Sequence, residues 1–222
     1  MLYTRFCFTT GDAAGQNMTS QATFAACEWI RANHPLQPRY ILSGAIDTDK
    51  KHSAMNMIQT RGKRVIAEFT LKREVARELL RIDTEQLYRY RQIAAVGALQ
   101  AGSAYSGAHA ANGIAAMFIA TGQDAANVAE SHGGITYGQL LENGDYYWSV
   151  TLPALICATH GGGTGLPTQR ECLEMLGCVG TGKADKLAEI IAAVVLAGDV
   201  SLTSAVLAGD WVTSHEALGR NR

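Results

Sequence analysis

Apolar and polar residues alternate along several short stretches of this chain, a pattern typical of β-strands that have one buried face. These stretches are also rich in residue types that favour strands, such as Val, Ile, Thr and the aromatic residues. They cover residues 3–9, 39–43, 62–71, 135–140 and 146–159. Asn143-Gly144 separates the last two, and this dipeptide favours a tight hairpin turn. The pattern therefore predicts five strands, with the last two paired as a hairpin.

Helices are expected between these strands. Residues 19–32 carry apolar side chains at roughly helical spacing, and Asn33-His34-Pro35 should end that helix because proline cannot continue it. A charged helix is expected over 73–81, and another begins near Thr168. Small residues dominate 97–122, which suits one closely packed central helix. This order of elements predicts an α+β fold.

The longest apolar run, residues 187–208, raises the question of a membrane span. It contains Glu189 and Asp199, and the step from Gly198 to Asp199 lies near its middle. A membrane-spanning helix needs about 20 mostly apolar residues, and an Asp at mid-span is costly in lipid. We therefore expect two core helices here, or one bent helix buried on most sides, and no membrane span.

Composition places the chain among soluble globular proteins. Its 222 residues make one domain or slightly more, and 47% hydrophobic against 18% charged residues allow a sizeable core. The 19 Lys and Arg balance 20 Asp and Glu, so no excess of positive charge favours nucleic-acid binding. Five cysteines without a CxxC motif disfavour a secreted disulfide scaffold. The N-terminus lacks the apolar core of a signal peptide, so we expect a cytoplasmic protein.

One polar loop concentrates candidate chemistry. Its sequence Asp47-Thr48-Asp49-Lys50-Lys51 sets two carboxylates beside two ammonium groups. Such an arrangement can hold Lys50 charged and aimed at an oxygen that develops negative charge. The same residues also fit an ordinary solvated turn, and the spacing alone leaves both interpretations open.

Asp124 and His215 are two further candidates. Asp124 follows the small-residue helix, where it can tune a nearby lysine or simply satisfy the end of a helix. His215 lies near the C-terminus and fits either a general acid or a surface histidine. The other five histidines lack metal-ligand spacing, so we expect no metal.

Two glycine-bearing segments can approach a ligand closely. Residues 12–18 run into a helix whose first N–H groups favour anions. Residues 161–165 include four glycines, which allow close backbone contact. Neither segment is a Walker loop or a GxGxxG after a strand, so each is a weak signal by itself.

Five motifs in a fixed order give the chain a resemblance to a known family. They read GDAAGQNM (11–18), TDKKHSAMN (48–56), AHAANGIAAMFIATGQDAAN (108–127), HGGGTGLPTQ (160–169) and SHEALGRNR (214–222). Together they resemble the catalytic portion of 3-hydroxy-3-methylglutaryl-CoA (HMG-CoA) reductase, and the resemblance runs over essentially the whole chain. In the first motif, Ala14 and Gln16 stand where the family commonly has methionine.

The resemblance implies a role for each matching position. Lys50 would stabilise the oxyanion of the reduced thioester, Asp124 would hydrogen-bond that lysine, and His215 would protonate the departing CoA thiolate. The positions that would line the NADP(H) site are Asp12, Gly15, Asn17 and Met18. The positions that would bind the acyl substrate are Ser43, Lys51 and Asn112.

The resemblance also implies an organisation and a reaction. Residues 1–42 would form part of a small ferredoxin-like nucleotide-binding subdomain, residues 43–53 the lysine loop, and residues 54–222 a large acyl- and CoA-binding domain. NADPH would deliver two successive hydrides to the HMG thioester, through a hemithioacetal and an aldehyde, to give mevalonate. The family's site lies at a dimer interface, so a homodimer is implied.

Family catalytic domains are nearly twice as long as this chain, and nothing in the chain matches the segment that carries the family's catalytic glutamate. Three hypotheses follow. The chain is a reductase that works with the missing half, a repurposed enzyme that performs non-redox acid–base or cyclisation chemistry on a natural-product intermediate without NADPH, or a non-catalytic dimeric scaffold. The joint presence of Lys50, Asp124 and His215 argues against the scaffold. Nucleotide binding separates the first hypothesis from the other two.

Overall fold

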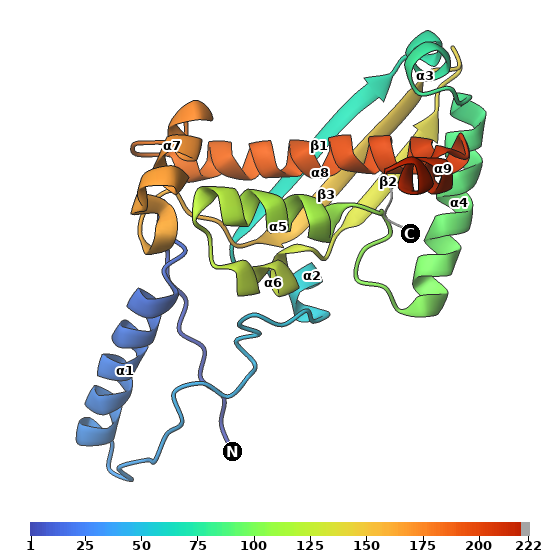
Figure 1. Cartoon of the computed structure of the whole chain (residues 1–222). Coiled ribbons are helices and arrows are strands. Elements are labelled where there is room, and N and C mark those ends of the chain that lie inside the picture. The colour runs from blue at the N-terminus through green and yellow to red at the C-terminus, as the bar shows by residue number, and fades with distance from the viewer. Residues whose placement is uncertain (219–222) are drawn as a thin grey trace.

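A three-stranded antiparallel sheet forms the centre of the chain, of which the computed structural model describes residues 1–218. The strands are β1 (Lys63–Leu71), β2 (Ile135–Leu140) and β3 (Tyr146–Leu155), and β3 lies between the other two (Figure 1). These strands confirm the ones predicted over 62–71 and 135–140 and the first ten residues of the one predicted over 146–159, and the hairpin at Asn143-Gly144 is confirmed as well. Residues 219–222, which end the C-terminal motif, lie outside the described residues.

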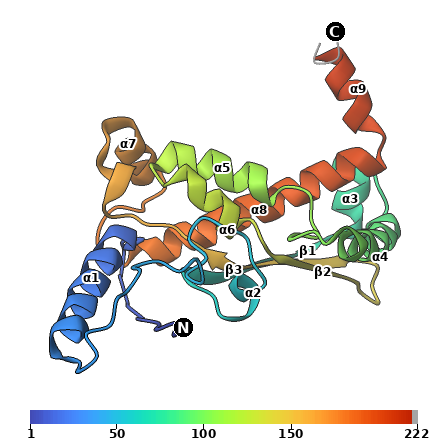
Figure 2. The ribbon, with the colours of Figure 1, turned by 90° about the horizontal axis from the view of Figure 1, so that it is seen from below.

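Helices cover one face of this sheet. α8 (Lys183–Leu207) crosses the strands, and α5 (Ala110–Thr121) lies beside it on the same side of the sheet (Figures 1 and 2). The side chains of Phe118, Trp148 and Ile191 are fully buried, so the core lies between these two helices and the sheet. Burial of such large apolar side chains is the main favourable term in folding.

The remaining helices are shorter or lie around this core. They are α1 (Gln16–Asn33), α2 (Met55–Ile58), α3 (Arg73–Leu79), α4 (Thr84–Ala101), α6 (Val128–Ser131), α7 (Pro167–Met175) and α9 (Asp210–Ala217), with 3₁₀ turns at Ala125–Asn127 and Gly162–Gly165. The helices predicted over 19–32, over 73–81 and from near Thr168 are confirmed as α1, α3 and α7.

Two surfaces leave apolar side chains in contact with solvent. The sheet face away from α8 carries Ile66, Ile135 and Tyr137, each more than half exposed. α1 contains no buried residue, and its Trp29 is 68% exposed. Exposed apolar patches of this kind are typical of surfaces that contact other polypeptide segments.

The apolar run over 187–208 forms a single helix, so the alternative of two core helices is wrong. α8 continues through Gly198 and Asp199 because both residues serve contacts with the segment before α5. A Cβ at Gly198 would lie 2.0 Å from His109 Nδ1, so only glycine permits this close approach. The carboxylate of Asp199 is fully buried and accepts the Tyr105 hydroxyl and two backbone N–H groups, those of Ala108 (2.8 Å) and His109 (2.7 Å).

Among the described residues, α8 is also the one helix long and apolar enough to cross a membrane. Length and composition alone are weak evidence, since the core helix of a soluble protein passes the same test. Here α8 packs against α5 and β1.

Three predicted elements are wrong. Residues 3–9 and 39–43 are irregular rather than strands, and no strand within residues 1–218 completes their hydrogen bonds. Residues 97–122 are not one helix, because α4 ends at Ala101 and Gly102 takes a left-handed conformation (φ 65°) that caps it. Residues 1–42 therefore contain one helix and no strand, and their ferredoxin-like character stays a prediction.

We predict that Asp199→Ala lowers the free energy of unfolding by about 3 kcal/mol, because it leaves buried donors without an acceptor. Asp185→Ala is the matched control on the same helix. The Asp185 side chain is 82% exposed, so its loss should cost under about 0.5 kcal/mol. Urea denaturation of both variants measures the difference, and equal losses would contradict the structural role of Asp199.

Candidate active site

An ion pair between Lys50 and Asp124 joins two segments that lie far apart in the sequence. Lys50 Nζ is 2.7 Å from Asp124 Oδ2, and each side chain is 40% exposed. Asp124 directly precedes the 3₁₀ turn at Ala125–Asn127, and its Oδ1 accepts the N–H of Ala126 at 3.0 Å. Asp124 therefore satisfies a helix end and contacts Lys50 at the same time, which makes the two sequence interpretations compatible.

The pair keeps both groups charged near neutral pH. The hydrogen bond to Asp124 raises the pKa of Lys50, and the same bond lowers the pKa of Asp124. Its stabilising effect is lost as pH rises through the raised Lys50 value, or falls through the lowered Asp124 value. Because both side chains meet solvent, that effect is at most about 1 kcal/mol. The pair thus provides a persistent, accessible ammonium group rather than much stability.

The backbone of the lysine loop has an unusual conformation. Thr48 (φ 57°) and Lys50 (φ 56°) both lie in the left-handed region, which residues with a Cβ seldom adopt. The backbone N–H of Lys50 donates to Glu130 at 2.6 Å. A neighbouring group therefore holds the lysine backbone in place while the side chain reaches Asp124.

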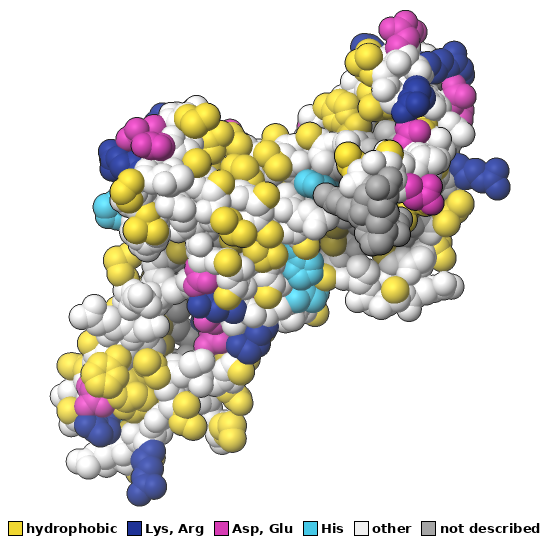
Figure 3. Space-filling model, viewed as in Figure 1, with side chains coloured by type: hydrophobic (Ala, Val, Ile, Leu, Met, Phe, Trp, Pro, Cys, Tyr) yellow, Lys and Arg dark blue, Asp and Glu magenta, His cyan; other side chains and the backbone are white. Residues whose placement is uncertain are grey.

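Two residues that contact this loop, Glu130 and Arg61, were missed by the sequence analysis, which noted Gln16 only as a departure from the first motif. Glu130 and Arg61 form a salt bridge behind the loop, and Gln16 at the start of α1 donates to both Asp49 (2.7 Å) and Asn127 (3.1 Å). Glu130 and Arg61 do not stand out in sequence, because single polar residues normally face solvent. Their burial and mutual contacts appear only in the folded chain. Figure 3 shows acidic and basic side chains gathered in this region between α1 and α6.

Asp12, a predicted nucleotide contact, turns toward the start of α8. Its carboxylate accepts the N–H groups of Gly182 (2.8 Å) and Ala184 (3.0 Å), and these hydrogen bonds lower its pKa. The next predicted residues lie where α1 begins. Gly15 has a φ of 77°, and a Cβ there would lie 2.2 Å from Thr10 Cγ2, so glycine is required. Asn17 and Met18 are exposed.

The predicted substrate residues are only partly brought together. Ser43 hydrogen-bonds Asp47, and Lys51 Nζ donates to the carbonyl of Asp49 at 2.8 Å, so both belong to the lysine loop. Asn112 is exposed near the start of α5, more than two helical turns from the end that precedes Asp124.

His215 lies at the other end of the molecule. It belongs to α9, which follows the C-terminal end of α8, whereas Asp12 binds the N-terminal end of that helix about 37 Å away (Figures 1 and 2). Its ring packs edge-on against Trp211. No hydrogen bond or ion pair within residues 1–218 joins His215 to Lys50 or Asp124. Within residues 1–218 of a single chain, Lys50 and Asp124 therefore meet, and His215 does not join them.

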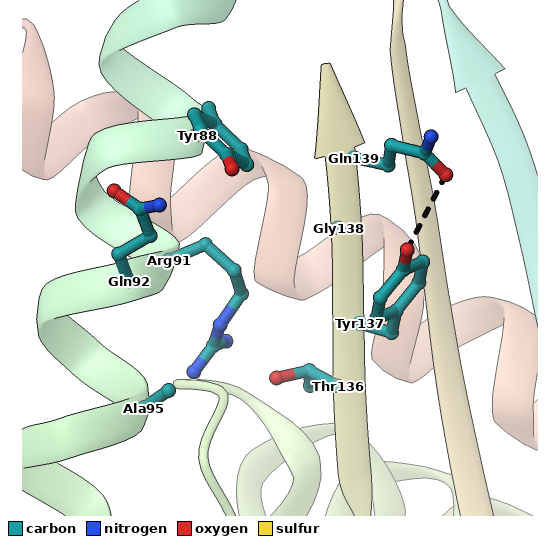
Figure 4. Close-up of a pocket in the computed structure, with 8 residues that line it drawn as sticks. All are labelled: Tyr88, Arg91, Gln92, Ala95, Thr136, Tyr137, Gly138 and Gln139. Atoms are coloured by element: carbon teal, nitrogen blue, oxygen red, sulfur yellow. Dashed lines mark hydrogen bonds between the residues drawn. The ribbon is translucent and has the colours of Figure 1, made fainter. Parts of the chain in front are cut away.

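A separate hollow of about 460 Å³ lies between α4 and β2 (Figure 4). Arg91 reaches into it from α4, beside Thr136, and donates to the carbonyl of Ser106 at 2.6 Å. The candidate residues from the sequence, all of them within the described part, do not line it. In that part, no three His, Cys, Asp or Glu side chains gather as a metal site either. The lysine loop is therefore the candidate site.

The fold and this site define a class of protein: an α+β chain with a partly exposed lysine–aspartate ion pair. The comparisons with known proteins are more specific. The family model of hydroxymethylglutaryl-coenzyme A reductase matches residues 1–220. The chain belongs to this family, which is a family of oxidoreductases.

Curated relatives are similar along nearly all of this chain. The 3-hydroxy-3-methylglutaryl-coenzyme A reductase of Aeropyrum pernix is 46% identical, covering 99% of this chain and 54% of the relative. The enzyme of Methanocaldococcus jannaschii is 42% identical, covering 99% and 55%. That of Drosophila melanogaster is also 42% identical, covering 96% of this chain and 24% of the relative. The chain thus spans about half the length of the archaeal relatives.

We predict that Asp124→Asn lowers the pKa of Lys50 toward its ordinary value near 10.4, because the ammonium loses its anionic partner. Trace acylation of lysines across alkaline pH, read by mass spectrometry, gives this pKa. Asp145→Asn is the matched control, since the hydrogen bond from Lys72 to Asp145 raises the pKa of Lys72 in the same way. The control should change Lys72 only. An unaltered Lys50 profile in Asp124→Asn would refute the pairing.

Proposed function

We propose that this chain carries the lysine–aspartate part of a site for NADPH-dependent reduction of an HMG thioester to mevalonate. The ion pair between Lys50 and Asp124 is the observation that carries the proposal. Membership of the reductase family supports the reaction type, and the relatives bear the name of that enzyme. Since the chain spans about half of those relatives, the complete reaction calls for their remaining part as well.

The proposed chemistry places the Lys50 ammonium beside the thioester oxygen. Reduction of a thioester carbonyl puts negative charge on that oxygen, and a fixed cation stabilises the charge most where water is excluded. Asp124 keeps Lys50 protonated and directs its ammonium group. Ser43 and Lys51 lie in the same loop as Lys50, where they are placed to bind the polar acyl group. Asn112 joins them only if the substrate or a second chain extends along α5.

NADPH, when bound, supplies the two hydrides. The beginning of α1 is the part of this chain that fits a phosphate-bearing cofactor, since the first N–H groups of a helix favour anions and Gly15 lets the backbone turn there. Asn17 and Met18 are accessible at that point. Asp12 is engaged by α8, so we assign it to docking this segment rather than to direct contact with the cofactor.

The position of His215 supports a homodimer. Thiolate release needs a proton donor, and His215 is the residue that the family resemblance assigns to that task. Within one chain it lies at the far end of α8 from the start of α1. A second copy is therefore the proposed source of the histidine at each site. We propose that such a dimer is cytoplasmic, with residues 1–42 as a nucleotide-binding segment, 43–53 as the lysine loop, and the rest as the acyl-binding domain.

One observation favours a second candidate function. The carboxylate of Asp12 is already satisfied by backbone donors, which removes one expected cofactor contact. A repurposed enzyme that performs acid–base or cyclisation chemistry with Lys50 and Asp124 would not need NADPH. Titration with NADPH of the chain mixed with the part of the Aeropyrum pernix reductase that it does not match, followed by NADPH fluorescence, separates the two. Saturable binding beyond that of the added part alone supports the reductase, and absence of such binding supports the non-redox enzyme.

We predict NADPH oxidation with HMG-CoA when the chain is mixed with the part of the Aeropyrum pernix reductase that it does not match. Lys50→Ala should reduce the rate by about 10²–10³-fold, the usual loss when an oxyanion-stabilising group is removed. The fall in NADPH absorbance measures the rate, and circular dichroism shows that the variant is folded. Oxidation that persists in Lys50→Ala would refute the role of the lysine.

His215→Gln should slow reduction of the thioester more than reduction of the free aldehyde. Only the thioester expels a thiolate that must be protonated, and loss of a general acid typically costs about 10²–10⁴-fold. Parallel NADPH assays on HMG-CoA and on the aldehyde intermediate measure both rates. Equal losses on the two substrates would show that His215 is not the acid for the thiolate.

A further inference from the structure

The lysine loop is anchored to a carboxylate whose side chain has no exposed surface. Glu130 of α6 accepts through Oε2 from Arg61 Nε (2.8 Å) and Asn56 Nδ2 (3.1 Å). Its Oε1 accepts from Arg61 Nη2 and from the backbone N–H of Lys50 (2.6 Å). A buried carboxylate is strongly unfavourable unless it is paired and hydrogen-bonded. Loss of these hydrogen bonds would leave a buried carboxylate unpaired, which would destabilise the folded chain.

Arg61 connects Glu130 to Asp49, the residue before Lys50. Its guanidinium contacts Glu130 with two nitrogens, the two-pronged geometry that arginine favours with carboxylates. Its Nη2 also donates to Asp49 Oδ1 at 2.6 Å. The hydrogen bonds to Glu130 raise the pKa of Arg61, so it stays charged. One guanidinium thus links a buried anion to the turn that presents the lysine.

A single short segment holds Lys50 at both ends. Asp124 binds its ammonium group and Glu130 binds its backbone N–H, with the 3₁₀ turn at Ala125–Asn127 between the two acids. Lys50 has a left-handed backbone (φ 56°), which a lysine seldom adopts without support. Because Asp124 and Glu130 belong to the same short segment, their separation is fixed. The direction of the Lys50 side chain follows from its contacts with these two acids.

We propose that Glu130 and Arg61 are positioning residues, which hold the backbone of Lys50 so that its ammonium group meets Asp124 and the substrate oxygen. Neither residue is one that the sequence pointed to. The catalytic meaning of this inference rests on the proposed function, while the geometry can be tested without turnover.

Glu130→Gln in the full chain tests the inference. The variant removes the charge that pairs with Arg61 and keeps the size of the side chain. Hydrogen exchange should show the backbone amides of residues 47–53 exchanging at least about tenfold faster, because the Lys50 N–H loses its anionic acceptor. Trace acylation should show the pKa of Lys50 falling, since the ammonium leaves Asp124. The charged groups that face the Lys50 ammonium are those of Asp124, Asp49 and Arg61.

The matched control is Glu174→Gln, which removes a carboxylate from an exposed pair with Arg170 on α7. It should leave both readouts of the lysine loop unchanged, and Lys72 should react equally in all variants. If Glu130→Gln is folded and both the amides and the amine of Lys50 behave as in the natural chain, the inference is wrong. If Glu130→Gln does not fold, Arg61→Lys takes its place. It keeps the positive charge but not the two-pronged contact, so the same shifts support the inference and unchanged values overturn it.

Turnover distinguishes this inference from the proposed function. In an active reductase, Glu130→Gln should lower kcat by a larger factor than it raises KM, because Lys50 is misplaced when charge develops on the oxygen. An unchanged kcat would overturn the positioning role while leaving the reductase intact. A natural chain that stays inactive after the unmatched part of the Aeropyrum pernix reductase is added, and whose Lys50 pKa still falls in Glu130→Gln, would refute the reductase and support the positioning.

Discussion

A carboxylate that is removed from water must find hydrogen-bond donors, and two such carboxylates organise this chain. Asp199, in the C-terminal half of α8, binds the N–H groups that precede α5 and the hydroxyl of Tyr105. Glu130 binds Arg61, Asn56 and the backbone of the lysine loop. Each acid joins segments separated by some 70 residues or more, so those segments are fixed relative to the sheet and not merely tethered to it.

This arrangement separates rigidity from accessibility around Lys50. The backbone of the lysine loop is held from inside by a fully buried acid, whereas the ammonium group and its partner Asp124 remain 40% exposed. A group that stabilises developing charge must be both fixed and reachable by the substrate. Here the interior provides the first property and the surface position provides the second. The exposed pair contributes little to stability, and the buried contacts behind it are the proposed source of its fixed position.

The segment before the lysine loop is attached by few contacts. Asp12 binds the start of α8, and Gln16 binds Asp49 and Asn127, yet no residue of α1 is buried. Its docking points are polar and lie at one end of the helix, beside the lysine loop. The start of α1 is thereby placed next to the lysine loop, while α9 and His215 lie at the opposite end of α8. The geometry of one chain thus brings together two of the three catalytic positions that the family resemblance implies, Lys50 and Asp124.

The sequence determined the family and the three strands of the sheet. Alternation marked the three strands that pack on the core, Asn143-Gly144 marked their hairpin, and five motifs identified the reductase family, Lys50 and Asp124 among them. The local pattern was misleading where tertiary contacts decide the structure. Residues 3–9 alternate, but no strand within residues 1–218 pairs with them. Gly198-Asp199 suggests a break, but α8 continues because Gly198 lies against the His109 ring and Asp199 accepts the His109 N–H. Glu130 and Arg61 were invisible for the same reason. Their role depends on burial and on partners far away along the chain, and only the folded chain decides both.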